Sequence, residues 1–369
     1  MQFSRSIATL LAASALVAPA SAAPNVVASI KPVHALVSLV MNGVAEPDLL
    51  LDGAASPHTY ALTPSDAQSL EAADVVFWTG EGLEMFLVDA LETLAGDAVS
   101  VELSEVDGIA LLPVREGGSF EAHQHHGEAH DHGDHAHEHG DDDHDHAEDH
   151  DHAEDHHYAE DHDDHAHEHE EHDHDEHEHE EHDHAHEHEG HDHQHGSMDM
   201  HVWLDPDNAA VMLTAIADTL ADVDPENAET YRANAEAGTA QLEQHETELA
   251  AQLAPVADRP FIVFHDAYQY FEQQFGLTVA GSITVSPEVM PGARRIGELR
   301  DRVQDLGATC VFAEPQFEPA IVDAIVEGTD ARTGVLDPEG GTLTPGADLY
   351  NQLLQGLAGS LVECLTPTE

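Results

Sequence analysis

Residues 261–268 read Phe261-Ile262-Val263-Phe264-His265-Asp266-Ala267-Tyr268, an apolar run that ends in polar residues. A short, continuous apolar run is typical of a buried strand, and the polar residues after it predict a turn into a helix. The elements that follow alternate in the same way: a helix near 267–275, a strand at 277–283, a helix at 292–306, a strand at 309–313, a helix near 318–327, a strand near 332–336 and a last helix from about 346 to 362. Strands that alternate with helices predict a parallel sheet covered by helices.

The first part of the chain shows the same alternation. The predicted strands are 26–30, 49–51, 75–78 and 99–103, and the predicted helices are 32–40, 64–72 and 85–94. The sequence therefore predicts an α/β protein with two αβ lobes, each built on a parallel sheet. The predicted boundaries are 23–222 for the first lobe, 223–255 for a linking helix and 256–369 for the second lobe.

Two helices are expected between these series. Residues 207–222 form one helix, with Asp205 near its N-cap. Residues 225–253 are good helix formers without an internal Pro, and a helix of this length would be roughly 43 Å long at about 1.5 Å per residue. Such a helix can run across the molecule and join the two lobes, although a long surface helix is the simpler alternative.

A histidine-rich tract interrupts the first lobe. Twenty-nine of the 34 histidines lie in 123–195, interleaved with Asp and Glu. Neutral imidazole and carboxylate oxygen both bind Zn²⁺, so we interpret residues 121–197 as a metal-gathering insertion. The segment is too poor in apolar residues to offset its ordering entropy, which predicts disorder. The alternative is a solvated acidic spacer in which the histidines are incidental.

The charge is strongly negative. The formal net charge is −65, and residues 121–199 contribute −32, which leaves −33 on the rest. This sign excludes nucleic acid as a partner.

The N-terminus predicts export. Arg5, an apolar stretch from Ile7 to Val17, and Ala20-Ser21-Ala22 fit a signal peptide over residues 1–22, cleaved after about Ala22. An N-terminal core helix is the alternative. We expect an exported, soluble protein in a bacterial periplasm. In that oxidising compartment the only two cysteines, Cys310 and Cys364, suggest a disulfide, and a zinc site is the competing interpretation.

Five histidines lie outside the tract, and three of them share a setting. His58 follows the predicted strand 49–51, His201 directly precedes a helix, and His265 follows the strand 261–264. Ligand groups gather at the carboxyl ends of parallel strands, so these three residues can form a three-nitrogen metal site with an open fourth position. Ordinary surface histidines are the alternative. We expect His245 to be solvated and His34 to have a packing or capping role.

Several motifs carry a resemblance to a known family. They are 53–66 (Gly-Ala-Ala-Ser-Pro-His-Thr-Tyr-Ala-Leu-Thr-Pro-Ser-Asp), 200–206 (Met-His-Val-Trp-Leu-Asp-Pro), 264–268, 312–317 (Phe-Ala-Glu-Pro-Gln-Phe) and 336–338 (Leu-Asp-Pro). With these motifs the chain resembles the zinc-specific solute-binding proteins of ABC uptake systems, the ZnuA type within the cluster A-I metal-binding family. The resemblance covers essentially the whole mature chain.

The resemblance implies how the chain would bind metal. Two lobes joined by a rigid long helix would hold Zn²⁺ in the cleft between them, with His58, His201 and His265 as ligands. Pro57 stands where some zinc members have Glu, so water or Asp337 would be the fourth ligand. Manganese-binding relatives have a carboxylate at the position of His265. The resemblance also supports pairing of Cys310 with Cys364.

The function predicted from these observations is capture of periplasmic Zn²⁺ and its delivery to the membrane subunit of an ABC permease, by a monomer that is not an enzyme. A periplasmic zinc metalloenzyme is one alternative, since three histidines and a water also describe catalytic zinc. A metal buffer or storage protein that acts through the tract alone is the other. The sequence contains no convincing general-base or nucleophile motif.

Overall fold

The computed structural model describes residues 22–115, 198–284, 291–307, 310–317 and 320–367. The predicted insertion 121–197, and the predicted signal peptide up to residue 21, lie outside the described residues. The chain divides into two compact units, and every described residue belongs to the unit that comprises Met1–Gln124 and His193–Glu369. None of the helices described is long and apolar enough to cross a membrane.

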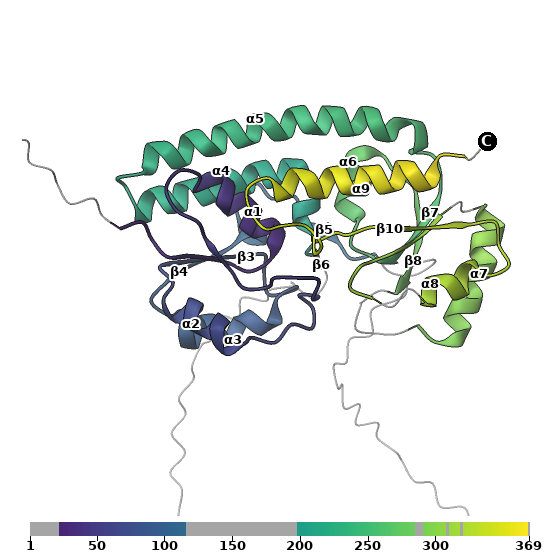
Figure 1. The fold of residues 1–369 in the computed structure, drawn as a ribbon, viewed down its shortest axis with the longest axis horizontal. Helices are drawn as coiled ribbons and strands as arrows, with labels where there is room; N and C mark the ends of the chain where they lie inside the picture. The colour runs from purple at the N-terminus through teal and green to yellow at the C-terminus, as the bar shows by residue number, and fades with distance from the viewer. Residues whose placement is uncertain (1–21, 116–197, 285–290, 308–309, 318–319, 368–369) are drawn as a thin grey trace, which may run out of the picture. The chain divides into compact units, whose positions relative to one another are not determined.

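The first lobe contains a four-stranded sheet in which all strands are parallel (Figure 1). Its strands, in spatial order, are β2 (Asp48–Leu49), β1 (Val26–Ala28), β3 (Val75–Trp78) and β4 (Val99–Glu102). The helices of this lobe are α1 (Lys31–Val40), α2 (Pro64–Glu71) and α3 (Met85–Leu94). Alternate residues of β1 face opposite sides, so Val26 and Ala28 pack in one core cluster and Val27 in another.

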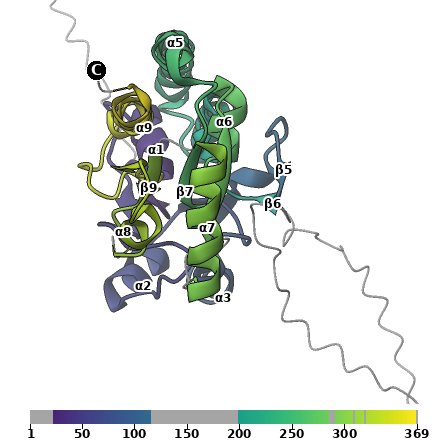
Figure 2. The same ribbon diagram turned by 90° about the vertical axis from the view of Figure 1, so that its right-hand side faces the viewer.

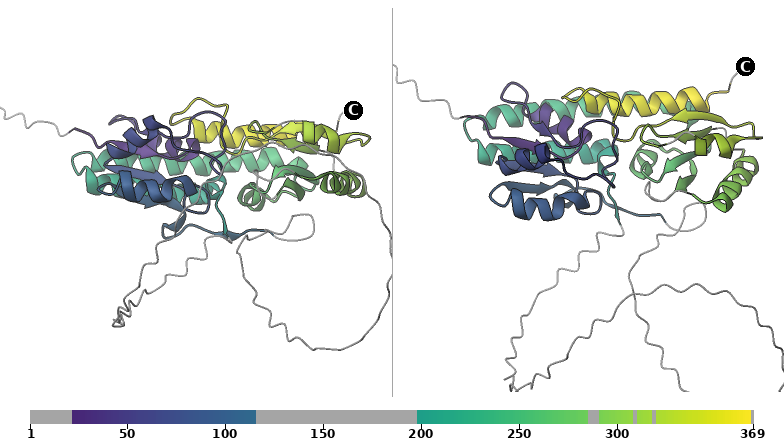
Figure 3. Two further views of the ribbon diagram at one scale, coloured as in Figure 1. Left: turned by 90° about the horizontal axis from the view of Figure 1, so that it is seen from below. Right: turned by 60° about the horizontal axis from the view of Figure 1, so that its bottom comes forward.

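The second lobe repeats this arrangement. Its parallel strands, in spatial order, are β10 (Arg332–Val335), β9 (Cys310–Ala313), β7 (Phe261–His265) and β8 (Val279–Thr284). Its helices are α6 (Gln269–Phe275), α7 (Ala293–Leu306), α8 (Ala320–Val326) and α9 (Leu349–Leu365). Figure 3 shows the sheets from below, with α2 and α3 (blue) beside the first sheet and α7 and α8 (green) beside the second. The predicted fold, two αβ lobes with parallel sheets, is confirmed.

The two lobes share one hydrophobic core. Residues Phe261 and Val263 of β7 lie in the same cluster as Val26 and Ala28 of β1, whereas Ile262 packs on the far face of its own sheet. The helices α4 (Pro206–Val223) and α5 (Ala228–Leu253) add their buried faces to this shared cluster. Continuous burial of apolar side chains from both lobes resists their separation.

Two helices connect the lobes. The predicted linking helix is α5, which begins at Ala228 because Asp224 ends α4 and a turn follows. It packs on α1, α4 and α9. Figure 2 shows α9, from the end of the chain, lying close to both α1 and α5. The predicted disulfide is present between Cys310 in β9 and Cys364 in α9, with a Cα–Cα distance of 6.1 Å, and it fastens α9 to the second sheet.

Candidate metal centre

The three predicted histidines reach one place from three kinds of local structure. His265 is the last residue of β7, at the carboxyl end of a parallel strand as expected. His58 lies in the turn-rich loop between β2 and α2. This loop ends at a capping box, in which Thr63 accepts a hydrogen bond from the backbone N–H of Asp66 and donates its own N–H to the Asp66 carboxylate.

His201 directly precedes a helix, as predicted, but the expectation that it lies at the end of a parallel strand was wrong. It follows β6 (Met198–Asp199), which pairs with β5 (Leu112–Pro113) in a two-stranded antiparallel ribbon. A short 3-10 helix over Val202–Leu204 comes next. The ribbon pairs the segments on either side of the predicted insertion, and no local pattern in the sequence predicts such a distant pairing.

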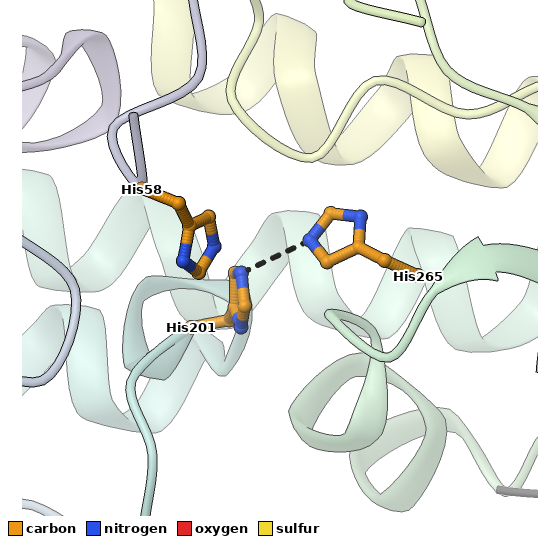
Figure 4. A group of neighbouring side chains, drawn as sticks. All are labelled: His58, His201 and His265. Carbon is orange, nitrogen blue, oxygen red and sulfur yellow. Dashed lines mark hydrogen bonds between the residues drawn. The ribbon is translucent and has the colours of Figure 1, made fainter. Parts of the chain in front are cut away.

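The three side chains converge. One ligand atom from each of His58, His201 and His265 lies within 4.8 Å of the others, and this is the one group of three or more metal-ligating side chains among the residues described. Figure 4 shows the three rings facing one another. The Nε2 atoms of His201 and His265 lie 3.3 Å apart. His201 and His265 are buried and His58 is half-buried.

Buried carboxylates orient two of the rings. The Nδ1 of His201 lies 2.7 Å from Oδ1 of Asp199, which also accepts the backbone N–H of His201. The Nδ1 of His265 lies 2.8 Å from each oxygen of Glu314. Because a carboxylate only accepts hydrogen bonds, Nδ1 carries the proton in both rings and Nε2 presents a lone pair. This carboxylate–histidine arrangement is the one that orients imidazole ligands around zinc.

The contact between the two Nε2 atoms follows from this assignment. With both Nδ1 atoms protonated, neither Nε2 can donate a hydrogen bond to the other, and two lone pairs meet at 3.3 Å. Such an arrangement is favourable only when a proton or a metal cation lies between the nitrogens. The residues therefore suit a cation that prefers imidazole nitrogen.

The histidines differ in their affinity for protons. Burial, reinforced by repulsion from His201 and His265, lowers the pKa of His58 well below its ordinary value, so His58 is neutral. Burial also opposes a charge on His265, but nearby carboxylates, Glu314 above all, outweigh it and raise the pKa of His265. His265 therefore takes up a proton more readily than His58 does.

Sequence reasoning missed Asp199 and Glu314. A signal was present for each: Asp199 stands two residues before His201, and Glu314 directly follows β9, the neighbour of β7 in the sheet. Carboxylates at such positions can reach the second ring nitrogen of a ligand histidine.

The other candidate residues have local roles. His34 packs in the first lobe, with its Nε2 3.1 Å from the carbonyl oxygen of Pro47. His245 is half-buried in α5 with a buried Nε2, so the expectation of a solvated side chain was wrong. Asp337 accepts hydrogen bonds from the backbone N–H groups of Gly341 at 3.0 Å and Thr342 at 3.2 Å, which orders its own loop. A fourth ligand, water or Asp337, stays a prediction.

The loop that contains Asp337 also touches the loop that carries His58. A Cβ added to Gly341 would lie 3.0 Å from the Cα of Ala54, so a larger residue there would push against the backbone of this loop. Lys31, the one lysine of the chain, is buried and donates to the carbonyl oxygens of Gly341 at 2.8 Å and Leu343 at 2.9 Å. It also lies 3.3 Å from the carboxylate of Asp52. These contacts seat the His58 loop against the second lobe.

The fold and the convergent histidines define a two-lobed α/β protein equipped to bind a metal cation. A family model described as zinc-uptake complex component A, periplasmic (ZnuA), matches residues 26–364, and the chain belongs to this family. Proteins named high-affinity zinc uptake system protein ZnuA are similar to it. The one from Brucella suis biovar 1 (strain 1330) is 50% identical over 342 residues, 93% of this chain and 92% of the relative. The one from Yersinia pestis is 35% identical over 348 residues, 93% of this chain and 92% of the relative.

Solved structures share the fold. A crystal structure of ZnuA covers 93% of this chain and 100% of its own, with a TM-score of 0.64 at 22% identity. A ZnuA deletion mutant with zinc bound covers 94% and 100%, with a TM-score of 0.63 at 21% identity. The mutant structure of the laminin-binding adhesin Lmb of Streptococcus agalactiae covers 93% and 100%, with a TM-score of 0.64 at 20% identity.

Proposed function

We propose that this chain captures Zn²⁺ in the periplasm and delivers it to the membrane subunit of an ABC permease. One nitrogen each from His58, His201 and His265 binds the ion, and water or Asp337 completes the coordination. The observation that carries this proposal is the pair of Nε2 atoms 3.3 Å apart whose rings are fixed by buried carboxylates. Membership of the periplasmic zinc-uptake family supports both the cargo and the compartment.

The donor set favours zinc over harder cations. Three imidazole nitrogens with at most one oxygen suit tetrahedral Zn²⁺, whereas Mn²⁺ prefers more oxygen ligands. The metal is cargo in this proposal, and the chain belongs to a family of uptake components, so we assign no catalytic step. The signal peptide 1–22, the lobe boundaries 23–222, 223–255 and 256–369, and a monomeric state complete the proposal.

Calorimetric zinc titration of the full-length chain and of a chain lacking 121–197 tests it. Both strands of the β5–β6 pair lie outside the deleted residues, so the deletion leaves this ribbon able to form. The shortened protein should keep one tight site, and His201→Ala should abolish that site. A buffer that acts through the tract would lose nearly all binding on deletion. Retention of tight one-to-one binding by His201→Ala in the shortened protein would contradict the site, and Asp337 and His34 would then be tested as ligands.

A further inference from the structure

A largely buried ion cluster lies beside His265. The guanidinium of Arg115 contacts two carboxylates at once: its Nε lies 3.0 Å from Oδ2 of Asp266, its Nη2 also contacts Asp266, and its Nη1 and Nη2 lie 2.6 and 2.9 Å from the oxygens of Glu272. The side chains of Asp266 and Glu272 are only 7% and 8% exposed, and that of Arg115 is 23% exposed. Paired, planar contacts of this kind fix geometry as well as charge.

The members of the cluster come from different elements of the fold. Arg115 follows β5 and is the last residue described before the insertion. Asp266 directly follows His265, and Glu272 belongs to α6. The guanidinium therefore fastens the β5–β6 ribbon to the turn that follows β7.

The ribbon is also the element that orients His201. Its second strand, β6, supplies Asp199, whose carboxylate accepts the Nδ1–H of His201. Tyr270 in α6 donates its hydroxyl to the carbonyl oxygen of Asp199 at 2.6 Å and accepts the backbone N–H of Leu112 at 3.0 Å. His201 is thus linked through Asp199 to the ribbon, and the ribbon is linked through Arg115 to Asp266. Asp266 in turn is the residue next to His265.

We infer that Arg115 is a positioning residue for zinc, which sets the spacing of His201 and His265 by fastening the ribbon to Asp266 and Glu272. The inference rests on the proposed function, in which both histidines are ligands. Metal–ligand distances tolerate only about 0.2 Å of error, and these two ligands stand on different elements. If the ribbon could move relative to β7, the spacing of His201 and His265 would vary. Zinc binding would then weaken even though every ligand residue is present.

The test uses the full-length chain, with free zinc set by a chelator buffer so that only the tightest site fills. Arg115→Gln should raise the zinc Kd about tenfold. Removal of a group that orients a metal ligand typically costs about 10–100-fold in affinity, and this expectation is the lower end of that range. The Kd of Arg115→Lys should lie between that of Arg115→Gln and that of the wild type. The lysine ammonium keeps the positive charge, but it cannot make the paired, planar contacts of a guanidinium with a carboxylate. The control is Arg232→Ala, which removes an exposed ion pair with Asp218 and should leave the Kd unchanged.

A second measurement separates positioning from stability. Loss of a partner for buried carboxylates lowers the Tm of the metal-free protein whatever its role in binding. The further stabilisation caused by zinc depends on the Kd, so a positioning role predicts a smaller zinc-induced rise in Tm for both Arg115 variants. An unchanged Kd and an unchanged zinc-induced rise in Arg115→Lys and Arg115→Gln would overturn the inference.

Two further outcomes are interpretable. If Arg115→Gln does not fold, Arg115→Lys alone decides, because it retains the positive charge among the carboxylates. His201→Ala, measured in parallel, tests the proposed function separately: tight binding by that variant contradicts the ligand assignment, whereas loss of binding there with a wild-type Kd in the Arg115 variants contradicts only the positioning role.

Discussion

Replacing Glu314 by glutamine should weaken zinc binding strongly with little change in packing. Glu314 is 3% exposed, and both of its oxygens lie 2.8 Å from the Nδ1 of His265. One oxygen also accepts the hydroxyl of Tyr268 at 3.2 Å. Glutamine has nearly the same shape, but it lacks the negative charge and replaces one acceptor by an NH₂ group, which cannot accept the Nδ1–H of His265.

The magnitude follows from the role of the carboxylate. Loss of a group that orients a ligand histidine costs about 10–100-fold in metal affinity, which corresponds to roughly 1.4–2.7 kcal/mol. The ratio of the zinc Kd of Glu314→Gln to that of the wild type should depend on pH. Glu314 raises the pKa of His265, so in the wild type zinc competes with a proton that the variant holds less firmly. The loss of affinity should therefore be largest at high pH and shrink as pH falls.

The same substitution should alter the pH dependence of the metal-free protein. A histidine whose pKa is raised in the folded state contributes stability that is fully present below its unfolded pKa and is lost as pH rises through the folded pKa. Glu314→Gln should remove this contribution. Between the unfolded and the folded pKa of His265, the unfolding free energy of the variant should therefore decline less with rising pH than that of the wild type. Denaturant unfolding of the metal-free proteins measures this difference.

Zinc affinity is best measured by competition with a chelator from about pH 6 to about pH 8, a range around the ordinary histidine pKa. The control is Asp224→Asn, which removes a buried carboxylate bound to the Tyr231 hydroxyl at the end of α4. It should lower stability without changing the zinc Kd. Wild-type affinity in Glu314→Gln across this range would refute the role assigned to the carboxylate.

Three further outcomes are expected. Zn²⁺ should raise the Tm of the chain lacking 121–197 by mass action and Mn²⁺ far less; equal shifts would remove the case for zinc selectivity. Cys310 and Cys364 should resist thiol reagents in exported, denatured protein without reductant, and two reactive thiols there would contradict the disulfide. Gly341→Ala should weaken zinc binding several-fold, because the added Cβ would lie 3.0 Å from a Cα in the His58 loop; an unchanged Kd would show that this contact does not seat the loop.

Periodicity and capping signals made most elements predictable. The apolar run before His265 is β7, and the helix predicted over 85–94 is α3 with the same bounds. Asp205 caps α4 as expected, since its carboxylate accepts the backbone N–H of Asp207 at 2.8 Å. These features depend on neighbours in the sequence, which is why they can be predicted from it.

Features that depend on distant pairing were not predictable. The pairing of Leu112 with Asp199 brings together residues on either side of the tract, so the ribbon could not be derived from local pattern. The core shared between the lobes was also unpredictable. A continuous apolar strand indicates that both of its faces are buried, but it does not show which distant helix covers each face.

Charge balance explains why this site should hold a divalent cation firmly. Asp199 and Glu314 are buried, at 6% and 3% exposure, and each contacts the Nδ1 of a histidine of the site. Without a cation, two negative charges are therefore buried behind the histidines, and burial of unpaired charge is costly. A proton on His265 compensates only one of them, whereas Zn²⁺ compensates both and occupies the lone pairs that otherwise face each other at 3.3 Å. Release of the ion must restore that charge, so we expect transfer to the permease to require either proton uptake by the site or movement of the His58 loop away from the other two ligands.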